Sequence, residues 1–390
     1  MISFDDTEVA FSDKTNAELN RGYLLFKLVG NPLLVSLGKV GLQMALALRL
    51  PINQIVRKTV FAHFCGGESI AQCETTIDNL HKAGVYSLLD YSSEGKESMQ
   101  ELDVSAREII AANTTGTRDI RIPFSVFKPT AIFPNKLLAK KNAGREFNED
   151  ELRAWKLSKQ RMALICLSAK ENNVPILIDA EETWFQSAID QLVEEQMELH
   201  NKKKAIVFNT VQLYRKDRLD FLKKSHEKAN QKGYLLGIKL VRGAYMEKER
   251  ERAQKQGYPS PIHTCKADTD TDYDLALQFC VKNHSSIHFI AGTHNEKSSL
   301  YLTELMKTNG ITTSDPKIFF SQLYGMSDNI SFNLAANSYN VVKYVPYGPI
   351  IEVLPYLIRR AEENTSLAGQ TSRELSLIIK ERARRRSVHA

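Results

Sequence analysis

The sequence is poor in cysteine, and none of its apolar stretches is long. Its five cysteines, among 390 residues, are scattered without a Cys-x-x-Cys pair. This excludes a disulfide-stapled scaffold and argues against a structural zinc site. The most apolar stretch, residues 23–50, is interrupted by Lys27, Pro32, Lys39 and Gln43. It therefore falls short of the run that a membrane-spanning helix needs.

Charge of one sign is also scarce outside the last residues. The formal net charge is +6, and most of that excess lies in residues 380–390. The nearly neutral body excludes an extended nucleic-acid-binding surface. The basic tail follows apolar residues at 375–379, so it is either an amphipathic helix that meets anionic lipid or a solvated helix end. The acidic residues 1–20 resemble neither a secretory signal nor a transit peptide, and we expect a cytoplasmic protein.

Eight short runs rich in β-branched and aromatic residues are separated mostly by segments of helical length and period. Their continuous apolar character is typical of parallel strands buried on both faces. The predicted strands are Val85–Leu89, Ile120–Phe127, Pro175–Asp179, Ala205–Asn209, Leu235–Leu240, Ile287–Ala291, Ile318–Ser321 and Val341–Tyr344. The predicted helices include Ser69–Ala83, Glu149–Glu171, Trp184–Leu199, Lys216–Lys232, Asp268–Val281 and Glu296–Thr308.

This alternation predicts an α/β fold, a (β/α)8 TIM-like barrel. We expect the barrel at residues 84–364, an N-terminal helical arm at 1–83, and a C-terminal helix with its basic tail at 365–390. A doubly wound open sheet is disfavoured, because no Gly-x-Gly-x-x-Gly follows the first strand. Polar residues also follow nearly all the strands, rather than gathering at one switch point.

The predicted strand ends are rich in cations and aromatic rings and poor in groups that would activate water. Arg359 and Arg360 are adjacent, and their forked donors match a carboxylate or phosphate, although such a pair is often merely solvated. Tyr356 lies three residues before Arg359, so both point from one helical face. With Tyr344 they predict a site for a small substrate that has an anionic end and an apolar body.

Two other chemistries remain open alternatives. Asp179, Glu181, His288 and His294 could supply metal ligands, although strand alternation does not place them all on one side. A thiolate nucleophile is disfavoured, because Cys265 and Cys280 have no evident base beside them in the sequence.

Seven motifs in these positions resemble the proline dehydrogenase family, in its monofunctional, eukaryote-like branch. Each falls in family order at a predicted strand end, and together they cover residues 84–364. They are Lys-Pro-Thr at 128–130, Asp-Ala-Glu-Glu at 179–182, Val-Gln at 211–212, Lys-Leu-Val-Arg-Gly-Ala-Tyr at 239–245, Thr-His-Asn at 293–295, Gln-Leu-Tyr-Gly-Met at 322–326, and Lys-Tyr-Val-Pro-Tyr-Gly-Pro from 343 with Pro-Tyr-Leu-x-Arg-Arg-Ala-x-Glu-Asn from 355.

The resemblance implies a distorted barrel that holds FAD and oxidises L-proline to Δ1-pyrroline-5-carboxylate. Hydride would pass from C5 of the substrate to flavin N5, and a membrane quinone would take the electrons. The substrate residues that it implies are Lys128, Asp179, Leu323, Tyr344, Tyr356, Arg359 and Arg360. Among these, the two arginines would bind the carboxylate with Lys128 nearby, and Asp179 would order Lys128 and the wall of the ring site.

For the cofactor, the resemblance implies contacts from the fourth to the seventh strand and the last helix: Gln212, Lys239, Arg242, Gly243, Tyr245, Thr293, His294, Asn295, Gln322 and Glu363. Many bacterial members have Arg first and Lys three residues later, so Lys239 and Arg242 are swapped here. No metal is implied. The chain is too short for the bifunctional bacterial form, so pyrroline-5-carboxylate dehydrogenase is expected as a separate chain.

Three further readings stay open. A 4-hydroxyproline dehydrogenase shares the family pattern, but tends to have a small residue where Tyr344 stands. A metal-dependent hydrolase or lyase would use Asp179, Glu181 and His294, and a non-catalytic relative would bind proline or a membrane partner.

We expect the enzyme to lie peripherally on the inner face of the cell membrane, through its basic tail or with the Leu-rich N-terminal segment.

Overall fold

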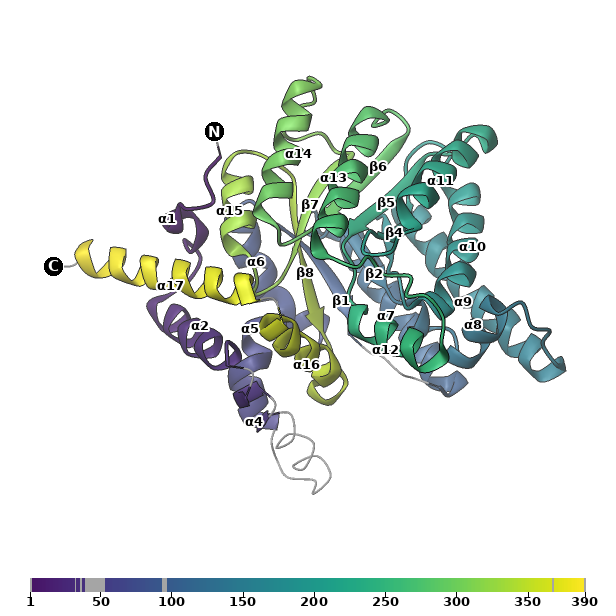
Figure 1. Cartoon of the computed structure of the whole chain (residues 1–390), viewed down its shortest axis with the longest axis horizontal. Helices are drawn as coiled ribbons and strands as arrows, with labels where there is room; N and C mark the ends of the chain where they lie inside the picture. The colour runs from purple at the N-terminus through teal and green to yellow at the C-terminus, as the bar shows by residue number, and fades with distance from the viewer. Residues whose placement is uncertain are drawn as a thin grey trace. The chain divides into compact units, whose positions relative to one another are not determined.

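The computed structural model describes residues 2–31, 33–35, 37–38, 53–92, 97–366 and 368–388. Within these residues, eight parallel strands follow one another around a closed barrel in sequence order (Figure 1). They are β1 (Tyr86–Tyr91), β2 (Phe124–Phe127), β3 (Ile176–Ile178), β4 (Val207–Gln212), β5 (Leu236–Val241), β6 (Ile287–Gly292), β7 (Ile318–Leu323) and β8 (Val341–Tyr347). The predicted fold class is confirmed.

The strands form where the sequence runs apolar, and most of their residues are buried. Their register brings the buried positions of neighbours together, as in Ser125 opposite Ile176 and Ile176 opposite Val207. Inside the barrel, the ring of Phe124 meets Phe208 and Phe319 edge-on. Such edge-to-face contacts between large rings fill a barrel interior efficiently.

All eight predicted strands are present, but β2 begins four residues later than predicted. Ile120 is 81% exposed and lies outside the sheet. The Asp119 carboxylate accepts a hydrogen bond of 2.9 Å from the backbone N–H of Arg121 and also binds its guanidinium. This local turn competes with strand pairing.

The helices between the strands agree closely with the prediction. Long examples begin at capping residues: Asn148 accepts a hydrogen bond from the Glu151 N–H, and the Glu151 carboxylate accepts one from the Asn148 N–H. From β1 to β7 the helices and helical turns are α7 (Met99–Arg118), η3 (Pro129–Ala131), α8 (Asn135–Asn142), α9 (Glu149–Asn172), α10 (Thr183–His200), α11 (Arg218–Lys232), α12 (Met246–Gln256), α13 (Lys266–Lys282) and α14 (Glu296–Thr308).

The chain forms two compact units, and each is described by itself. One unit holds residues 88–321, with most of the barrel strands and the helices from α7 to α14. The other unit combines residues 1–87 with residues 322–390. The N-terminal arm therefore packs with the last strand and the C-terminal helices.

The second unit is built on segments from both ends of the chain. Its elements are α1 (Thr7–Ala10), α2 (Asn16–Val29), α4 (Asn53–Val56), the π-helical η1 (Arg57–Phe61), α5 (Ala62–Phe64), η2 (Ile70–Cys73), α6 (Glu74–Lys82), α15 (Asp328–Ala336), β8, α16 (Ile350–Ser366) and α17 (Ala368–Val388). The predicted helix at 69–83 is thus a 3-10 turn followed by an α-helix. Helix α17 lies alongside α2 (Figure 1).

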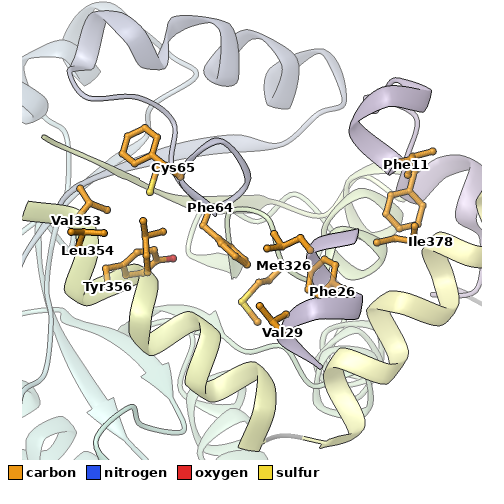
Figure 2. Packing of buried hydrophobic residues seen from close by; sticks show 14 of the residues in the cluster. Phe11, Phe26, Val29, Phe64, Cys65, Met326, Val353, Leu354, Tyr356 and Ile378 are labelled. Atoms are coloured by element: carbon orange, nitrogen blue, oxygen red, sulfur yellow. The ribbon is translucent and has the colours of Figure 1, made fainter. Parts of the chain in front are cut away.

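An apolar cluster joins these segments. Phe26 and Val29 of α2 lie with Phe64, Met326 and Tyr356 in a buried core shown in Figure 2. Ile378 of α17 belongs to the same cluster. Burial of this much apolar surface is the main stabilising term that holds the N-terminal arm to the C-terminal helices.

None of the described helices is long and apolar enough to cross a membrane. All five cysteines are free thiols, and four of them are buried. Burial raises the pKa of Cys73 to about 12, so this thiol stays protonated and unreactive.

Candidate active site

An ion pair links two of the predicted site residues in the first unit. Lys239 lies in β5, and Asp179 follows β3 directly. The Lys239 ammonium group contacts the Asp179 carboxylate, and the two side chains are only 7% and 15% exposed. Alternate strands of such a barrel contribute side chains to the same interior layer, which explains how β3 and β5 bring the pair together. A nearly buried cation is thus fixed at the strand ends.

A second ion pair connects Lys128 with Asp90. The Lys128 ammonium nitrogen lies 3.3 Å from Asp90 Oδ2, and both side chains are largely buried. Sequence reasoning gave Lys128 to Asp179 as a partner and missed Asp90. A signal for Asp90 existed, because it is the acidic residue directly after the first predicted strand, Val85–Leu89.

Glu181 organises the loop after β3. Its buried carboxylate accepts hydrogen bonds from the Thr130 hydroxyl at 2.7 Å and the Tyr245 hydroxyl at 3.0 Å. Its backbone carbonyl accepts one from the Gln212 side-chain amide at 2.8 Å. The predicted cofactor residues Gln212 and Tyr245 are therefore brought to one place. The hydrogen bonds that Glu181 accepts account for a buried carboxylate without any metal.

Arg242, directly after β5, binds residues of α13, of α14 and of the loop before α14. Its guanidinium donates to Asp270 at 2.7 Å, to the Thr293 hydroxyl at 2.6 Å and to Ser298 at 2.9 Å. It also stacks over the Tyr273 ring at 4.3 Å. Burial opposes ionisation of Asp270, but hydrogen bonds from Lys266 and Arg242 hold the pKa of Asp270 below its usual value. Arg242 is thus held by several partners at once.

The loop after β6 leads into the N-terminus of α14. Asn295 caps this helix by accepting a hydrogen bond from the Ser298 N–H at 3.2 Å. The Thr293 hydroxyl accepts one from the Asn295 N–H at 3.1 Å, and His294 between them is half-buried. Because helix N-termini and Arg side chains both favour negative charge, this loop suits an anionic group.

Gly243 has a left-handed φ of +136°. A Cβ atom there would lie 2.4 Å from Cδ1 of Tyr214. The family resemblance implied only that Gly243 contacts the cofactor. The structure adds a local reason, since both the backbone conformation and the Tyr214 ring exclude a side chain.

The remaining predicted residues lie in the second unit. Gln322 is buried and accepts a hydrogen bond from the Ser331 hydroxyl at 2.8 Å. The Tyr344 carbonyl accepts one from the Tyr324 N–H at 2.8 Å, and the Tyr344 side chain is buried. Leu323 packs at the edge of the apolar cluster.

Helix α16 carries the predicted arginines. The Arg360 guanidinium lies 5.3 Å from the centre of the Tyr356 ring, and both residues are buried, whereas Arg359 is half-buried. The sequence analysis placed Tyr356 and Arg359 on one helical face. In the structure, the cation that lies over the Tyr356 ring is Arg360. The predicted side chain of Glu363 lies outside the described residues.

The alternative metal residues do not form a cluster. Among the residues that the structure describes, no group of three or more His, Cys, Asp or Glu side chains could hold a metal ion. Burial lowers the pKa of His288, within β6, to about 4.

The barrel holds two lysines, each in an ion pair with an aspartate, and an arginine bound by several partners. Together with the N-terminus of α14, these groups are typical of a barrel enzyme that binds an anionic ligand. A model of the family described as proline dehydrogenase matches residues 73–373. The mitochondrial proline dehydrogenase 1 of Dictyostelium discoideum is 31% identical over 98% of this chain and 74% of its own length. The chain belongs to the proline dehydrogenase family and is an oxidoreductase, as its sequence predicted.

Two further comparisons bear on substrate and fold. The hydroxyproline dehydrogenase of Xenopus laevis is 29% identical over 98% of this chain and 90% of its own length. The crystal structure of proline utilization A from Bdellovibrio bacteriovorus superposes with a TM-score of 0.72 at 21% identity. The superposition covers 93% of this chain but 37% of that protein, so this chain spans about a third of its length.

Proposed function

We propose that this protein oxidises L-proline to Δ1-pyrroline-5-carboxylate with FAD as its cofactor and a membrane quinone as the final electron acceptor. The observation that carries the proposal is the family match at residues 73–373, because it contains every predicted substrate and cofactor residue. Turnover of L-proline with stoichiometric flavin tests it, and a protein without either would refute it.

The residues present fit FAD. Gln212 ends β4, Lys239 lies within β5 and Arg242 follows β5 directly, so an amide and two cations come from these neighbouring strands. Helix α14 begins just after the Thr293 loop. Diphosphate groups favour such donors, and so does an electron-accepting ring that gains negative charge. FAD, when bound, would accept the hydride and the two electrons that the substrate loses.

The protein's own residues bind and orient the substrate in this proposal. Arg359 and Arg360 bind the proline carboxylate, since guanidinium groups pair with carboxylates in a bidentate geometry. Lys128, kept in place by Asp90, adds positive charge for the same end of the substrate. Tyr344, Tyr356 and Leu323 bound the apolar ring and exclude water, so catalysis depends chiefly on orientation.

The two swapped cations, Lys239 in β5 and Arg242 directly after it, have distinct roles in this proposal. Lys239 is nearly buried within its strand and pairs with Asp179, while Arg242 is bound to Asp270, Thr293 and Ser298. We assign to Lys239 the contact with the electron-accepting ring, because its ammonium group is a compact charge inside the barrel. Arg242 holds the Thr293 loop in place, and we assign that loop to the remaining part of the cofactor.

The relative in Xenopus laevis keeps 4-hydroxyproline as a second candidate substrate. Against it, the buried ring of Tyr344 stands at the sequence position where the resemblance implies a small residue in the hydroxyproline enzymes. A hydroxyl pressed against a ring without a partner loses its hydrogen bonds to water. Proline is therefore the preferred substrate of this chain.

The membrane contact is better assigned to the N-terminal leucines than to the basic tail. Arg384 and Arg385 bind the buried Glu381, and Arg382 lies 4.3 Å from the Tyr23 ring centre. Five exposed leucines, by contrast, lie on and just after α2: Leu24, Leu28, Leu33, Leu34 and Leu37. An exposed apolar surface of this kind suits a lipid interface.

Liposomes that contain anionic lipid test this assignment. Leu28→Ser with Leu37→Ser should weaken sedimentation with the vesicles, whereas Arg386→Gln on the exposed side of the tail should change it little. The reverse result would return the contact to the tail. The proposal places the protein at the inner face of the cell membrane, with a separate pyrroline-5-carboxylate dehydrogenase consuming its product.

A further inference from the structure

The end of β7 and the turn after it, residues 323–327, are held from several sides within the second unit. The Lys343 ammonium group donates to the carbonyl of Leu323 at 3.3 Å and to that of Met326. His63 Nε2 lies 2.9 Å from the Gly325 carbonyl. Gly325 has a φ of +77°, and a Cβ there would lie 2.3 Å from the His63 carbonyl oxygen, so only glycine fits.

Lys343 is the central support of this turn. Its side chain is fully buried in β8, directly before Tyr344. Its ammonium nitrogen lies 2.8 Å from Asp328 Oδ1, at the start of α15. A buried cation needs both a counter-charge and hydrogen-bond acceptors, and here Asp328 and the two carbonyls provide them. Lys343 therefore links the backbone of Leu323 to Asp328.

Asp328 is also linked to the N-terminal arm. Its Oδ2 lies 3.7 Å from the Lys14 ammonium nitrogen, which in turn is 2.7 Å from Asp13. Burial opposes ionisation of Asp328, but Lys343 and Lys14 hold its pKa below the usual value. Burial also opposes the charge on Lys14, yet Asp328, Tyr324 and Asp13 raise its pKa. The side chains of Asp13, Lys14, Asp328 and Lys343 form a largely buried row of alternating acidic and basic groups, named here the arm network.

The backbone at Lys14 is fixed independently by α17. Arg385 donates to the Lys14 carbonyl at 2.8 Å and to the Phe11 carbonyl at 2.8 Å. Glu381, fully buried, holds the Arg385 guanidinium at 2.7 Å. The basic tail thus fixes the arm at the residue whose side chain reaches Asp328.

We infer that Lys14 is a positioning residue for the substrate site: through Asp328 and Lys343, the arm network sets the place of Leu323 and Tyr344. The inference rests on the proposed function, in which those two residues bound the proline ring. It accounts for Tyr324, Gly325 and Met326, which the proposed function leaves without a role. The N-terminal arm is then part of the enzyme's specificity apparatus.

The test compares Lys14→Met with Lys27→Met in the full-length, flavin-loaded protein. Lys27 is an exposed cation of the same arm and stays outside the network. Lys14→Met should raise the proline KM about 10-fold with a smaller effect on kcat, because a small displacement of a wall residue weakens orientation. Lys14→Arg should restore most of the loss, and Lys27→Met should behave as the parent protein.

Amide hydrogen exchange supplies a readout that does not depend on activity. Lys14→Met should speed exchange at Tyr324 and Met326, whose N–H groups bond to the carbonyls of Tyr344 and Leu323. Faster exchange confined to α1 and α2, with KM unchanged, would overturn the inference. Should Lys14→Met fail to fold, Asp13→Asn perturbs the same network from its outer end, and unchanged KM and turn exchange there would likewise overturn it.

The two proposals fail in different ways. A parent protein that does not oxidise proline refutes the proposed function, and with it the substrate role of the arm network. A parent protein that oxidises proline while Lys14→Met matches Lys27→Met in both KM and turn exchange refutes the inference alone.

Discussion

Lys239 in β5 and Asp179 after β3 form an ion pair that is almost shielded from water, although 60 residues separate them along the chain. Each charge has been removed from bulk solvent, so each depends on the other. In the proposed reaction, this pair holds a cation beside the electron-accepting ring.

The first prediction concerns the stability of this pair. Asp179→Asn should lower the free energy of unfolding by about 3 kcal/mol, because it leaves the Lys239 charge nearly buried without its counter-charge. Urea denaturation measures the change. The matched control is Glu195→Gln, which breaks the exposed pair with Lys159 and should cost less than about 1 kcal/mol. Equal losses of unfolding free energy in the two variants would show that the Lys239–Asp179 pair is exposed to water.

The second prediction separates substrate from cofactor binding. Arg359→Ala should raise the proline KM by about 100-fold, since a charge-assisted bidentate contact is lost, while the flavin stays bound. Steady-state kinetics and the flavin absorbance measure both quantities. Arg153→Ala, an exposed arginine on α9, is the control. Loss of flavin from the Arg359 variant would assign this residue to the cofactor.

The third prediction concerns the turn after β5. Gly243→Ala should weaken flavin binding and destabilise the protein by more than about 2 kcal/mol, because the new Cβ would collide with Tyr214 in an already strained conformation. Gly257→Ala is matched, since Gly257 also has positive φ but has open space around it. It should cost about 1 kcal/mol. Similar effects of both substitutions would show that contact with Tyr214 does not add to the cost of a side chain at residue 243.

The fourth prediction concerns substrate choice. Tyr344→Ser should increase the ratio of kcat/KM for trans-4-hydroxyproline over that for proline by about 10-fold, because a hydroxyl partner and space replace a ring face. Tyr344→Phe keeps the ring and should leave the ratio near that of the parent protein. A parent protein that already prefers hydroxyproline would reverse the assignment.

The fifth prediction is a pH dependence of stability from His63. Burial is the main cause that lowers its pKa, Lys14 and Arg21 add to it, and Asp328 and the Gly325 carbonyl oppose it, which leaves a pKa of about 4. Unfolded histidine titrates near 6.5, so below that pH the unfolded state takes up a proton that the folded state refuses. The free energy of unfolding should therefore fall between pH 6.5 and about 4, and His63 should contribute nothing to its slope above pH 7.

Urea denaturation at several pH values, with His63→Gln as the reference, measures this dependence. The difference between the two proteins isolates His63, since His288 has a similarly lowered pKa and is present in both. Parallel pH profiles would contradict a buried, neutral His63.

The barrel could be predicted because its strands carry their own signal. Continuous apolar runs such as Ile176–Ile178 have few alternatives to burial on both faces, and their ends mark where polar groups gather. Residue pairing carries no such local signal. Asp90 meets Lys128 only after the first two strands are placed side by side, and the pattern of either strand alone does not specify that contact.

The two ends of the chain show the same limit more clearly. The basic tail reads as a lipid-facing or solvated helix end, yet Arg385 binds the carbonyls of Phe11 and Lys14, more than 370 residues away. Only tertiary packing of α17 on α2 brings them together, so neither composition nor periodicity could predict it.

The most direct test of the central claim is a visible spectrum of the purified protein, recorded before and after excess L-proline is added without oxygen. We expect a flavin band at roughly 450 nm that bleaches on addition of proline. A flavin band that persists after proline is added would contradict proline as the substrate. A colourless protein that cannot be reconstituted with FAD would contradict the proposed chemistry altogether.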